Sequence, residues 1–355
     1  MSGEFKNGFA PSFGCALPVD DDGVVQIAHG GGGRKTAQLV ENVFLPAFRN
    51  DLLAPLADGA VLCVGAERIA FTTDTFVVQP VFFPGGDIGS LAVHGTVNDL
   101  AMCGAEPIGI SVGLVLEEGF AMTDLRRIVA SIAAASAAVG APVMTGDTKV
   151  VDRGKGDGVY INTSGIGRVR DNVDISPANA RPGDMIIVSG PVGDHGIAVM
   201  AARSGIDLRT RLESDSAPVQ LMVRALLDAA PATHVLRDPT RGGLATALCE
   251  IATSSGVGVL IAEASVPVRS EVRGACELLG FDPLYVACEG RFLAVVPRED
   301  AERALAAVQS LPQGKEAQIV GEIIASDAGR VLLRTQLGSH RRLERLSGEQ
   351  LPRIC

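Results

Sequence analysis

The sequence predicts an α/β (α+β) protein with two domains. Its 355 residues exceed what a single core of ordinary size usually holds. Strand-like and helix-like patterns alternate on both sides of a polar, Pro-containing stretch at 171–184, and such a stretch is typical of a linker. Hydrophobic residues make up 47% of the chain and charged residues only 20%, which indicates compact cores rather than long disordered segments.

The part before the linker is expected to hold an N-terminal arm with a Gly-rich loop and a first helix (1–58) and then a domain (59–170). The domain pattern contains strands of mixed direction and two helices. Asp87 follows a Pro-Gly-Gly turn and is expected to cap the first of these helices. The expected helices are 35–53, 88–102 and 124–139, and the expected strands are 60–64, 69–73, 77–83, 108–116, 143–150 and 159–168.

The part after the linker is expected to form a second α/β domain (184–335). From residue 336 to residue 355 the chain is polar and basic and has few apolar residues. We therefore expect a mobile tail without a packed element, ending in Cys355. The expected strands of the second domain are 185–189, 257–262 and 292–296, and the expected helices are 197–203, 217–229, 244–254, 272–279 and 300–310.

Composition excludes several classes of protein. The formal net charge is -10, from 31 basic and 41 acidic residues, whereas a nucleic-acid-binding protein needs a basic surface. The sequence has neither a signal-peptide pattern nor an apolar run of about 18 residues that could span a bilayer. Seven cysteines without a C-x-x-C pair indicate neither a disulfide framework nor a zinc site. We expect a cytoplasmic protein with no nucleic-acid or membrane partner.

A run of four glycines precedes the first expected helix. Backbone N–H groups in such a run can approach a phosphate at a helix start. The run is not a P-loop, because Arg34 rather than glycine precedes Lys35-Thr36. A flexible hinge and a phosphate cradle both remain open for these residues, which are Gly30, Gly31, Gly32 and Gly33.

Five aspartates stand at the ends of expected elements. Each alone is typical of a cap or turn. Together they suggest a site where Mg²⁺ bridges carboxylates to nucleotide phosphates. Asp87 and Asp99 would lie about 18 Å apart on one helix, so they would serve separate ions, opposite ends of the nucleotide or two subunits. The five are Asp74, Asp87, Asp99, Asp147 and Asp238.

These motifs resemble the PurM-like ATP-binding superfamily, which includes aminoimidazole ribonucleotide (AIR) synthetase, selenophosphate synthetase and thiamine-monophosphate kinase. Within it the chain is similar to the hydrogenase maturation factors that act as carbamoyl dehydratases. The superfamily motifs are Thr72-Thr73-Asp74, 97–105 and Gly146-Asp147-Thr148. The closer resemblance lies in 29–35, 82–89, Gly193-Asp194-His195-Gly196, 238–243, Cys288-Glu289-Gly290 and Pro352-Arg353-Ile354-Cys355.

The resemblance implies a PurM-like two-domain fold. Its N-terminal mixed sheet would pair across a homodimer, its C-terminal domain would be an α/β sandwich, and ATP would bind between the domains. It also implies that the carbamoyltransferase HypF loads a carbamoyl group onto Cys355. This chain would then use ATP to dehydrate that thiocarbamate to a thiocyanate, the cyanide donor for the iron of nickel-iron hydrogenase assembled on HypC–HypD.

That chemistry needs a cation near the transferring group and a base near the amide nitrogen. We expect Lys149 to supply the cation, since it lies two residues past Asp147 on the same face of a strand, and Glu289 to be the base. Mg²⁺ is expected on Asp74, Asp99, Asp147 and Asp238. The residues expected to contact the nucleotide or its metal are Gly30, Gly31, Gly32, Gly33, Lys35, Asp74, Asp87, Asn98, Asp99, Asp147 and Asp238.

Two alternatives remain open. A selenophosphate-synthetase-like enzyme would act on a free small molecule with Cys15 as nucleophile, but no lysine soon follows that cysteine. A noncatalytic nucleotide-binding scaffold would bind partners through its tail and leave Cys355 chemically unchanged.

Overall fold

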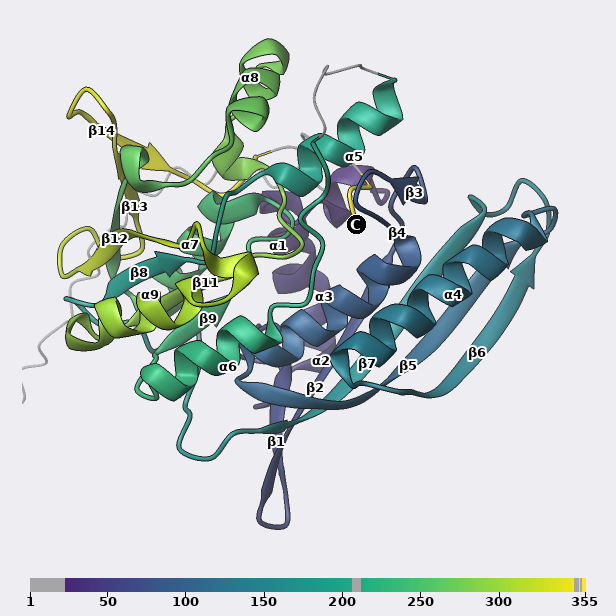
Figure 1. Ribbon diagram of the computed structural model, residues 1–355, viewed down its shortest axis with the longest axis horizontal. Coiled ribbons are helices and arrows are strands. Elements are labelled where there is room, and N and C mark those ends of the chain that lie inside the picture. Colours follow the sequence, from purple (N-terminus) through teal and green to yellow (C-terminus); the bar gives the residue numbers. More distant parts are fainter. Residues whose placement is uncertain (1–22, 206–211, 348–350, 352) are drawn as a thin grey trace, which may run out of the picture.

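The computed structural model describes residues 23–205, 212–347, 351 and 353–355. It shows an α/β fold with one mixed sheet in each half of the chain (Figure 1). Cys15, the alternative nucleophile, lies outside the described residues. The elements of the first half are α1 (Arg34–Leu39), α2 (Leu45–Phe48), β1 (Ala60–Val64), β2 (Glu67–Phe76), β3 (Phe82–Phe83), β4 (Gly86–Asp87), α3 (Ile88–Met102), β5 (Ala105–Glu117), α4 (Met122–Val139), β6 (Val143–Val151) and β7 (Val159–Val169).

The N-terminal sheet has the strand order β1-β2-β7-β5-β6. Only β5 and β6 run parallel; the other neighbours are antiparallel. Helices α3 and α4 cover one face (Figure 1). Asp87 caps α3 as predicted, because its Oδ1 accepts hydrogen bonds from the N–H groups of Gly89 and Ser90 at 2.8 and 3.0 Å.

The C-terminal half forms a seven-stranded sheet with the order β14-β13-β10-β12-β8-β11-β9. Its β8 strand shows why both faces are covered: Ile186 and Val188 pack with α7, and Ile187 packs with α6 and α9. The elements are β8 (Met185–Val188), α5 (Asp194–Ser204), α6 (Gln220–Ala229), β9 (Val235–Arg237), α7 (Gly243–Ser255), β10 (Gly258–Ala262), α8 (Ser270–Leu279), β11 (Leu293–Val296), α9 (Ala301–Gln309), β12 (Gln318–Ile324), β13 (Val331–Arg334) and β14 (His340–Leu343).

The two halves meet along α3, which contacts its own sheet on one side and α6 and β9 of the C-terminal half on the other. Asn98 of α3 joins them through main-chain groups: its amide nitrogen donates to the carbonyls of Ala217 and Glu289 at 3.1 and 3.2 Å, and its oxygen accepts from Val219 N at 2.9 Å. Because Asn98 is buried, these bonds fix the two halves against each other.

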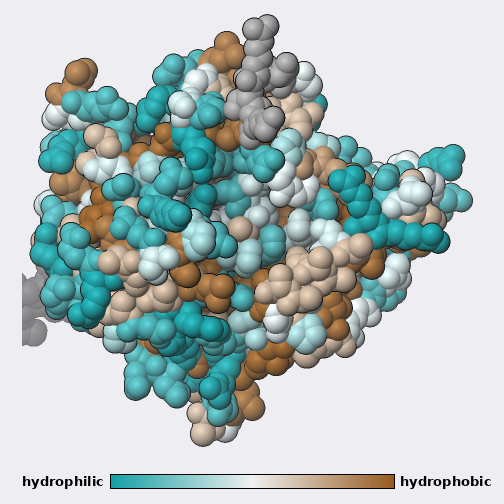
Figure 2. All heavy atoms as spheres, in the orientation of Figure 1, coloured by the Kyte–Doolittle hydropathy of each residue, from teal (hydrophilic) through white to brown (hydrophobic). Residues whose placement is uncertain are grey.

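Much of the outer face of the N-terminal sheet is exposed in the described part of the chain. Hydrophobic surface is visible along the lower edge of this sheet (Figure 2), and β6 is exposed from Val143 to Val150. Exposed large hydrophobic side chains of the sheet strands are Val64, Phe71, Ile108, Val115, Val143, Met144 and Val150.

Two expectations about local structure are wrong. Residues 77–81 are not part of a strand, because the N–H groups of Val77 and Gln79 donate to the terminal carboxylate of Cys355 and the carbonyl of Arg353 and not to another strand of the sheet. The segment after residue 336 does contain a packed element, β14, in which the buried Leu343 joins the C-terminal core. Among the described residues, no helix is both long and hydrophobic enough to cross a bilayer.

Candidate active site

Three carboxylates from distant parts of the sequence meet where the two halves join. Asp58 lies in the loop before β1, Asp99 on α3, and Asp238 directly after β9. One oxygen from each lies within 4.8 Å of the others. Thr72 Oγ1 lies 2.7 Å from Asp99 Oδ2, which holds that carboxylate in place. Oxygen donors at this spacing suit a hard divalent cation such as Mg²⁺.

The cluster opens into a cavity of about 210 Å³ between the two halves. Asp74, at the end of β2, and Glu289, just before β11, line the same cavity as Asp99 and Asp238. Cys355, the last residue of the chain, lines it as well. The structure thus brings together a carboxylate cluster, a candidate base and the candidate carrier thiol.

Burial and mutual repulsion disfavour the ionised form of these carboxyl groups. Burial is the largest cause for each member, and it raises the pKa of Asp58 to about 6. The pKa values of Asp99, Asp238 and Glu289 lie well above their ordinary values, because burial and neighbouring carboxylates both disfavour the anions. A divalent cation would remove this repulsion, so the electrostatics of the site match those of a metal-binding site.

Arg237 fixes one side of the cluster. Its guanidinium lies 2.7 Å from Asp58 Oδ1 and 2.6 Å from Glu250 Oε2. The positive charge acts against the effect of burial and lowers the pKa of Asp58. Arg237 therefore keeps one carboxylate of the cluster partly ionised and fixes its orientation.

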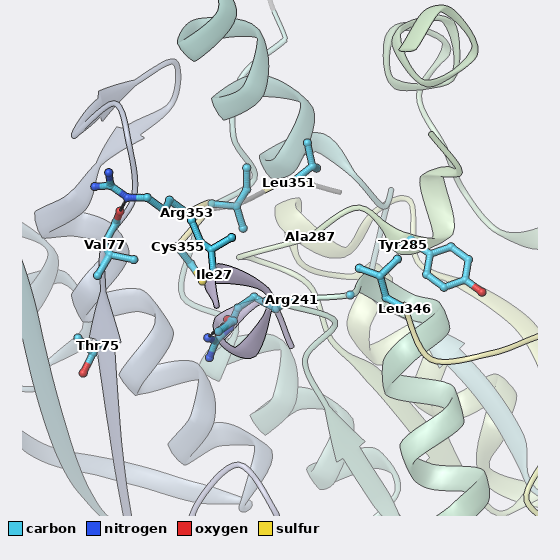
Figure 3. A pocket seen from close by; sticks show the side chains of 14 residues that line it. Ile27, Thr75, Val77, Arg241, Tyr285, Ala287, Leu346, Leu351, Arg353 and Cys355 are labelled. Atoms are coloured by element: carbon cyan, nitrogen blue, oxygen red, sulfur yellow. Dashed lines mark hydrogen bonds between the residues drawn. The ribbon is translucent and has the colours of Figure 1, made fainter. Parts of the chain in front are cut away.

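Arg241 lies on the other side, beside the carrier thiol. It lines the cavity with Cys355 and Glu289, and Figure 3 shows its side chain near Cys355. Burial raises the pKa of the Cys355 thiol to about 12, although the charge of Arg241 opposes this rise. At neutral pH the unloaded thiol is therefore protonated while the tail lies in the site.

The Gly-rich loop is joined to this site through Arg241. The Nη1 atom of Arg241 donates to the carbonyl of Gly30 at 2.9 Å. Gly32 has a φ of +74°, and a side chain there would place its Cβ 2.6 Å from the Cβ of Arg241, so only glycine fits. Gly30 and Gly31 line a neighbouring pocket with Cys355, and Lys35 Nζ donates to Gln26 Oε1 at 2.6 Å.

The described chain does not bring all the expected residues to the cluster. Asp87 caps the far end of α3. Asp147 and Lys149 lie on the exposed strand β6 and pair with each other at 2.7 Å. Three strand spacings separate β6 from β2, which carries Asp74, or about 14 Å, so Asp147 cannot share an ion with Asp74 within one chain. The side-chain amide of Asn98 makes the hydrogen bonds to main-chain groups that are described above.

Sequence reasoning missed Asp58, Arg237 and Arg241 as site residues. Arg237 directly precedes the motif 238–243, and Arg241 lies within it. Their closeness in sequence to the predicted metal ligand Asp238 was the one indication that they belong to the site. Asp58 precedes Gly59 and a strand, which is typical of a turn residue. No local pattern distinguishes it from such a turn.

Comparison with known proteins identifies the family. Two protein-family models match this chain. The model "AIR synthase related protein, N-terminal domain" matches residues 56–169, and "AIR synthase related protein, C-terminal domain" matches residues 181–334. The carbamoyl dehydratase HypE of Azotobacter vinelandii is 50% identical over 334 residues, which cover 94% of this chain and 98% of that protein.

Solved structures show the same similarity. A crystal structure of a HypE–HypF complex contains a chain that is 45% identical, with a TM-score of 0.83, covering 87% of this chain and 99% of that chain. A crystal structure of HypE in complex with ATP is 46% identical, with a TM-score of 0.79, covering 94% of this chain and 100% of that one.

Proposed function

This chain belongs to the HypE carbamoyl dehydratase family of AIR synthase related proteins, and we propose that it dehydrates a carbamoyl group carried on its own last residue. The substrate would be a thiocarbamate on Cys355 and the product a thiocyanate, which supplies the cyanide ligand for the iron of nickel-iron hydrogenase. The observation that carries the proposal is that Cys355 lines the carboxylate cavity with Glu289 and Arg241.

The proposed reaction couples removal of one oxygen to cleavage of ATP. The thiocarbamate oxygen attacks the γ-phosphorus, ADP leaves, and one N–H proton is lost, which forms an O-phosphorylated imidate on sulfur. The C–O bond then breaks with loss of the second N–H proton, and phosphate departs as the C≡N bond forms. Of the two protons, one ends on inorganic phosphate and the other is released.

Glu289 is suited to remove these protons. It is buried, and within the described residues its Oε1 atom has no hydrogen-bond partner, so that oxygen is free to accept a proton from the amide. Its pKa is raised by burial and by neighbouring carboxylates, and a base of raised pKa is more effective near neutral pH. Glu289 N donates to Asp215 Oδ1 at 3.1 Å, which keeps the residue in place.

Arg241 is the cation that this chain supplies next to the thiol. Charge builds up on the oxygens of the transferring phosphoryl group and on the attacking oxygen, and a guanidinium fixed nearby lowers the energy of that charge. Its bond to Gly30 would close the Gly-rich loop over the nucleotide. Lys149 would act on the same group only from a second subunit.

Asp58, Asp99 and Asp238 are the residues that would hold Mg²⁺, and Asp74 lines the same cavity. When bound, the ion would neutralise charge on the ATP phosphates. Burial and mutual repulsion raise the pKa values of Asp99 and Asp238, and a bound cation would relieve that repulsion.

We further propose a homodimer formed through the N-terminal sheet. β6 is an edge strand whose residues are exposed on both faces, and an uncovered edge with apolar side chains favours pairing with another chain. Pairing here would cover Val143, Met144 and Val150. It would also carry Asp147 and Lys149 of the partner subunit toward the cavity that they do not reach within their own chain.

HypF is the partner proposed to load Cys355, in keeping with the solved HypE–HypF complex of a relative. HypC–HypD is proposed as the receiver of the cyanide. Both encounters require the tail to leave the cavity, since Cys355 is part-buried where it lies.

Mass spectrometry of the C-terminal peptide tests the proposal. After incubation with HypF and its substrates, we expect the mass of a carbamoyl group on Cys355, followed by loss of one water only when ATP is added. ATP turnover that persists in Cys355→Ala would instead indicate a free small-molecule substrate. Nucleotide binding with no change at Cys355 would indicate a scaffold. Either result would refute the proposed reaction.

A further inference from the structure

The last residues of the chain are held mainly by their backbone. On one side, the N–H groups of Val77 and Gln79 donate to the terminal carboxylate of Cys355 and to the carbonyl of Arg353, at 3.0 and 3.2 Å. Main-chain hydrogen bonds to an extended segment are a common way to bind a peptide. On the other side, helix α5 contributes Arg203, whose Nη2 donates to the carbonyl of Arg353 at 2.5 Å.

His195, at the start of α5, contacts the remaining carbonyl. Its Nε2 atom lies 2.7 Å from the oxygen of Ile354, and its Nδ1 atom lies 2.7 Å from Ser214 Oγ. Since a carbonyl only accepts, Nε2 must carry the hydrogen. Ser214 Oγ accepts from Ser216 N at 3.0 Å and is free to donate its own hydrogen to Nδ1. The whole chain of bonds therefore fixes one neutral tautomer of His195.

The surroundings of His195 exclude a role as the proton-transferring base. The side chain is fully buried, and its ring stands edge-on to Phe83, with 5.6 Å between centroids. Burial lowers its pKa to about 4, so the ring is neutral near pH 7. It does not line the carboxylate cavity. His195 can affect the reaction through its hydrogen bond to the carbonyl of Ile354, the residue before Cys355.

We propose that His195 is a positioning residue for the carrier thiol, an inference that rests on the proposed function. His195 fixes the peptide group between Ile354 and Cys355, and the N–H group of Val77 holds the terminal carboxylate of Cys355. With the main chain held on both sides of its Cα atom, the thiol can move only by rotation about its own side-chain bonds. A loaded group would therefore meet the nucleotide and Glu289 in one orientation, which is what reaction between bound groups requires.

Three variants in the full-length chain test this role. His195→Phe keeps a ring against Phe83 but removes both hydrogen bonds, whereas His195→Gln keeps an amide N–H that can donate to Ile354. Ser214→Ala removes the group that fixes the tautomer and changes no residue in contact with the tail. His340→Phe, on the exposed strand β14, is the matched control.

Two measurements are made on each variant. The first is the single-turnover rate of ATP-dependent water loss from carbamoyl-Cys355. The second is the rate at which iodoacetamide alkylates unloaded Cys355, followed on the C-terminal peptide by mass spectrometry. Loss of one buried hydrogen bond shifts the docking equilibrium about fivefold to thirtyfold. We expect His195→Phe to slow water loss and to speed alkylation by such factors, with ATP affinity within twofold of the unaltered protein. We expect His195→Gln to recover most of both losses and Ser214→Ala to lie between them.

Equal alkylation rates in His195→Phe and the unaltered protein would overturn the proposal, and so would a loss of ATP affinity matching the loss of rate. The alkylation measurement needs neither HypF nor ATP. If the unaltered protein never loses water, the proposed function fails, and the alkylation rates still decide whether His195 holds the tail.

Discussion

Ile354→Ala is expected to release the tail from the active site without unfolding the protein. The Ile354 side chain is 3% exposed and belongs to the hydrophobic cluster of the N-terminal half, where it packs with residues such as Val199 and Ala287. It is the main apolar anchor of the last three residues. The neighbouring Arg353 is held by an ion pair with Asp157, and Cys355 must remain free to react.

The magnitude follows from the burial. Truncating a buried isoleucine to alanine costs about 2–5 kcal/mol, and the low end, about 2–3 kcal/mol, applies at a chain end that can relax. Because the tail can leave while the two domains stay folded, this cost falls on docking rather than on global stability. A loss of 2–3 kcal/mol lowers the docking constant about 30-fold to 150-fold.

Alkylation of Cys355 at pH 8 measures that constant. In the docked tail burial raises the thiol pKa to about 12, so almost no reactive thiolate is present. In a released tail the thiol recovers an ordinary pKa of about 8.5 and reacts. The alkylation rate should therefore rise with the released fraction, while the thermal midpoint of unfolding stays nearly constant.

Leu337→Ala is the control, because Leu337 is 96% exposed on the turn before β14. This variant should leave both the alkylation rate and the thermal midpoint unchanged. An alkylation rate in Ile354→Ala within threefold of the unaltered protein would show that burial of Ile354 does not hold the tail, and the reasoning would fail.

The remaining predictions concern the cavity. Glu289→Gln should lower the rate of water loss at Cys355 by about 100-fold to 10,000-fold, the usual contribution of a general base, and should leave carbamoylation by HypF intact; an unchanged rate would assign the base elsewhere. In the metal-free protein, stability should fall as pH rises from about 4 through about 6. The folded Asp58 has a pKa of about 6, so below its unfolded value of about 3.9 its protonation contributes fully, and this contribution is lost as the pH passes 6. Added Mg²⁺ should therefore raise the thermal midpoint more at pH 7.5 than at pH 5, measured by scanning fluorimetry, and a larger effect at pH 5 would contradict the electrostatic account. Asp238→Asn should reduce the Mg²⁺-dependent gain at pH 7.5, and a full gain in that variant would remove Asp238 from the metal site.

Local pattern predicted most of the secondary structure, and it failed where distant segments meet. Residues 77–83 are rich in valine and phenylalanine, which are typical of strands, but Val77 and Gln79 hydrogen-bond to the end of the chain and only Phe82–Phe83 forms a short pair. A contact across more than 270 residues leaves no trace in a local window. Strands β9, β13 and β14 were missed for a related reason, because strands of three or four residues gain their stability from neighbours rather than from propensity. The seven-residue strand β12 was missed as well.

The candidate site residues that lie within sequence motifs could be predicted. Asp99 and Asp238 lie in the expected motifs and do meet, and Glu289 and Cys355 line one cavity. Asp58 could not be found, since an Asp-Gly pair before a strand is common in turns. Asp147 and Lys149 are in the expected motif, yet they lie on an open edge strand, because a motif gives the residue types and not their place in the fold.

Cys355 lies in a cavity of its own chain, and this position has a kinetic consequence. A substrate joined to its enzyme by the backbone is present at a fixed local concentration, on the order of millimolar for a short tether. Dilution of the protein would leave the rate of dehydration per molecule unchanged, and only the steps that involve other proteins would slow. Each chain would also hold a single equivalent of product, so throughput in a cell would depend on how fast the thiol is unloaded and charged again.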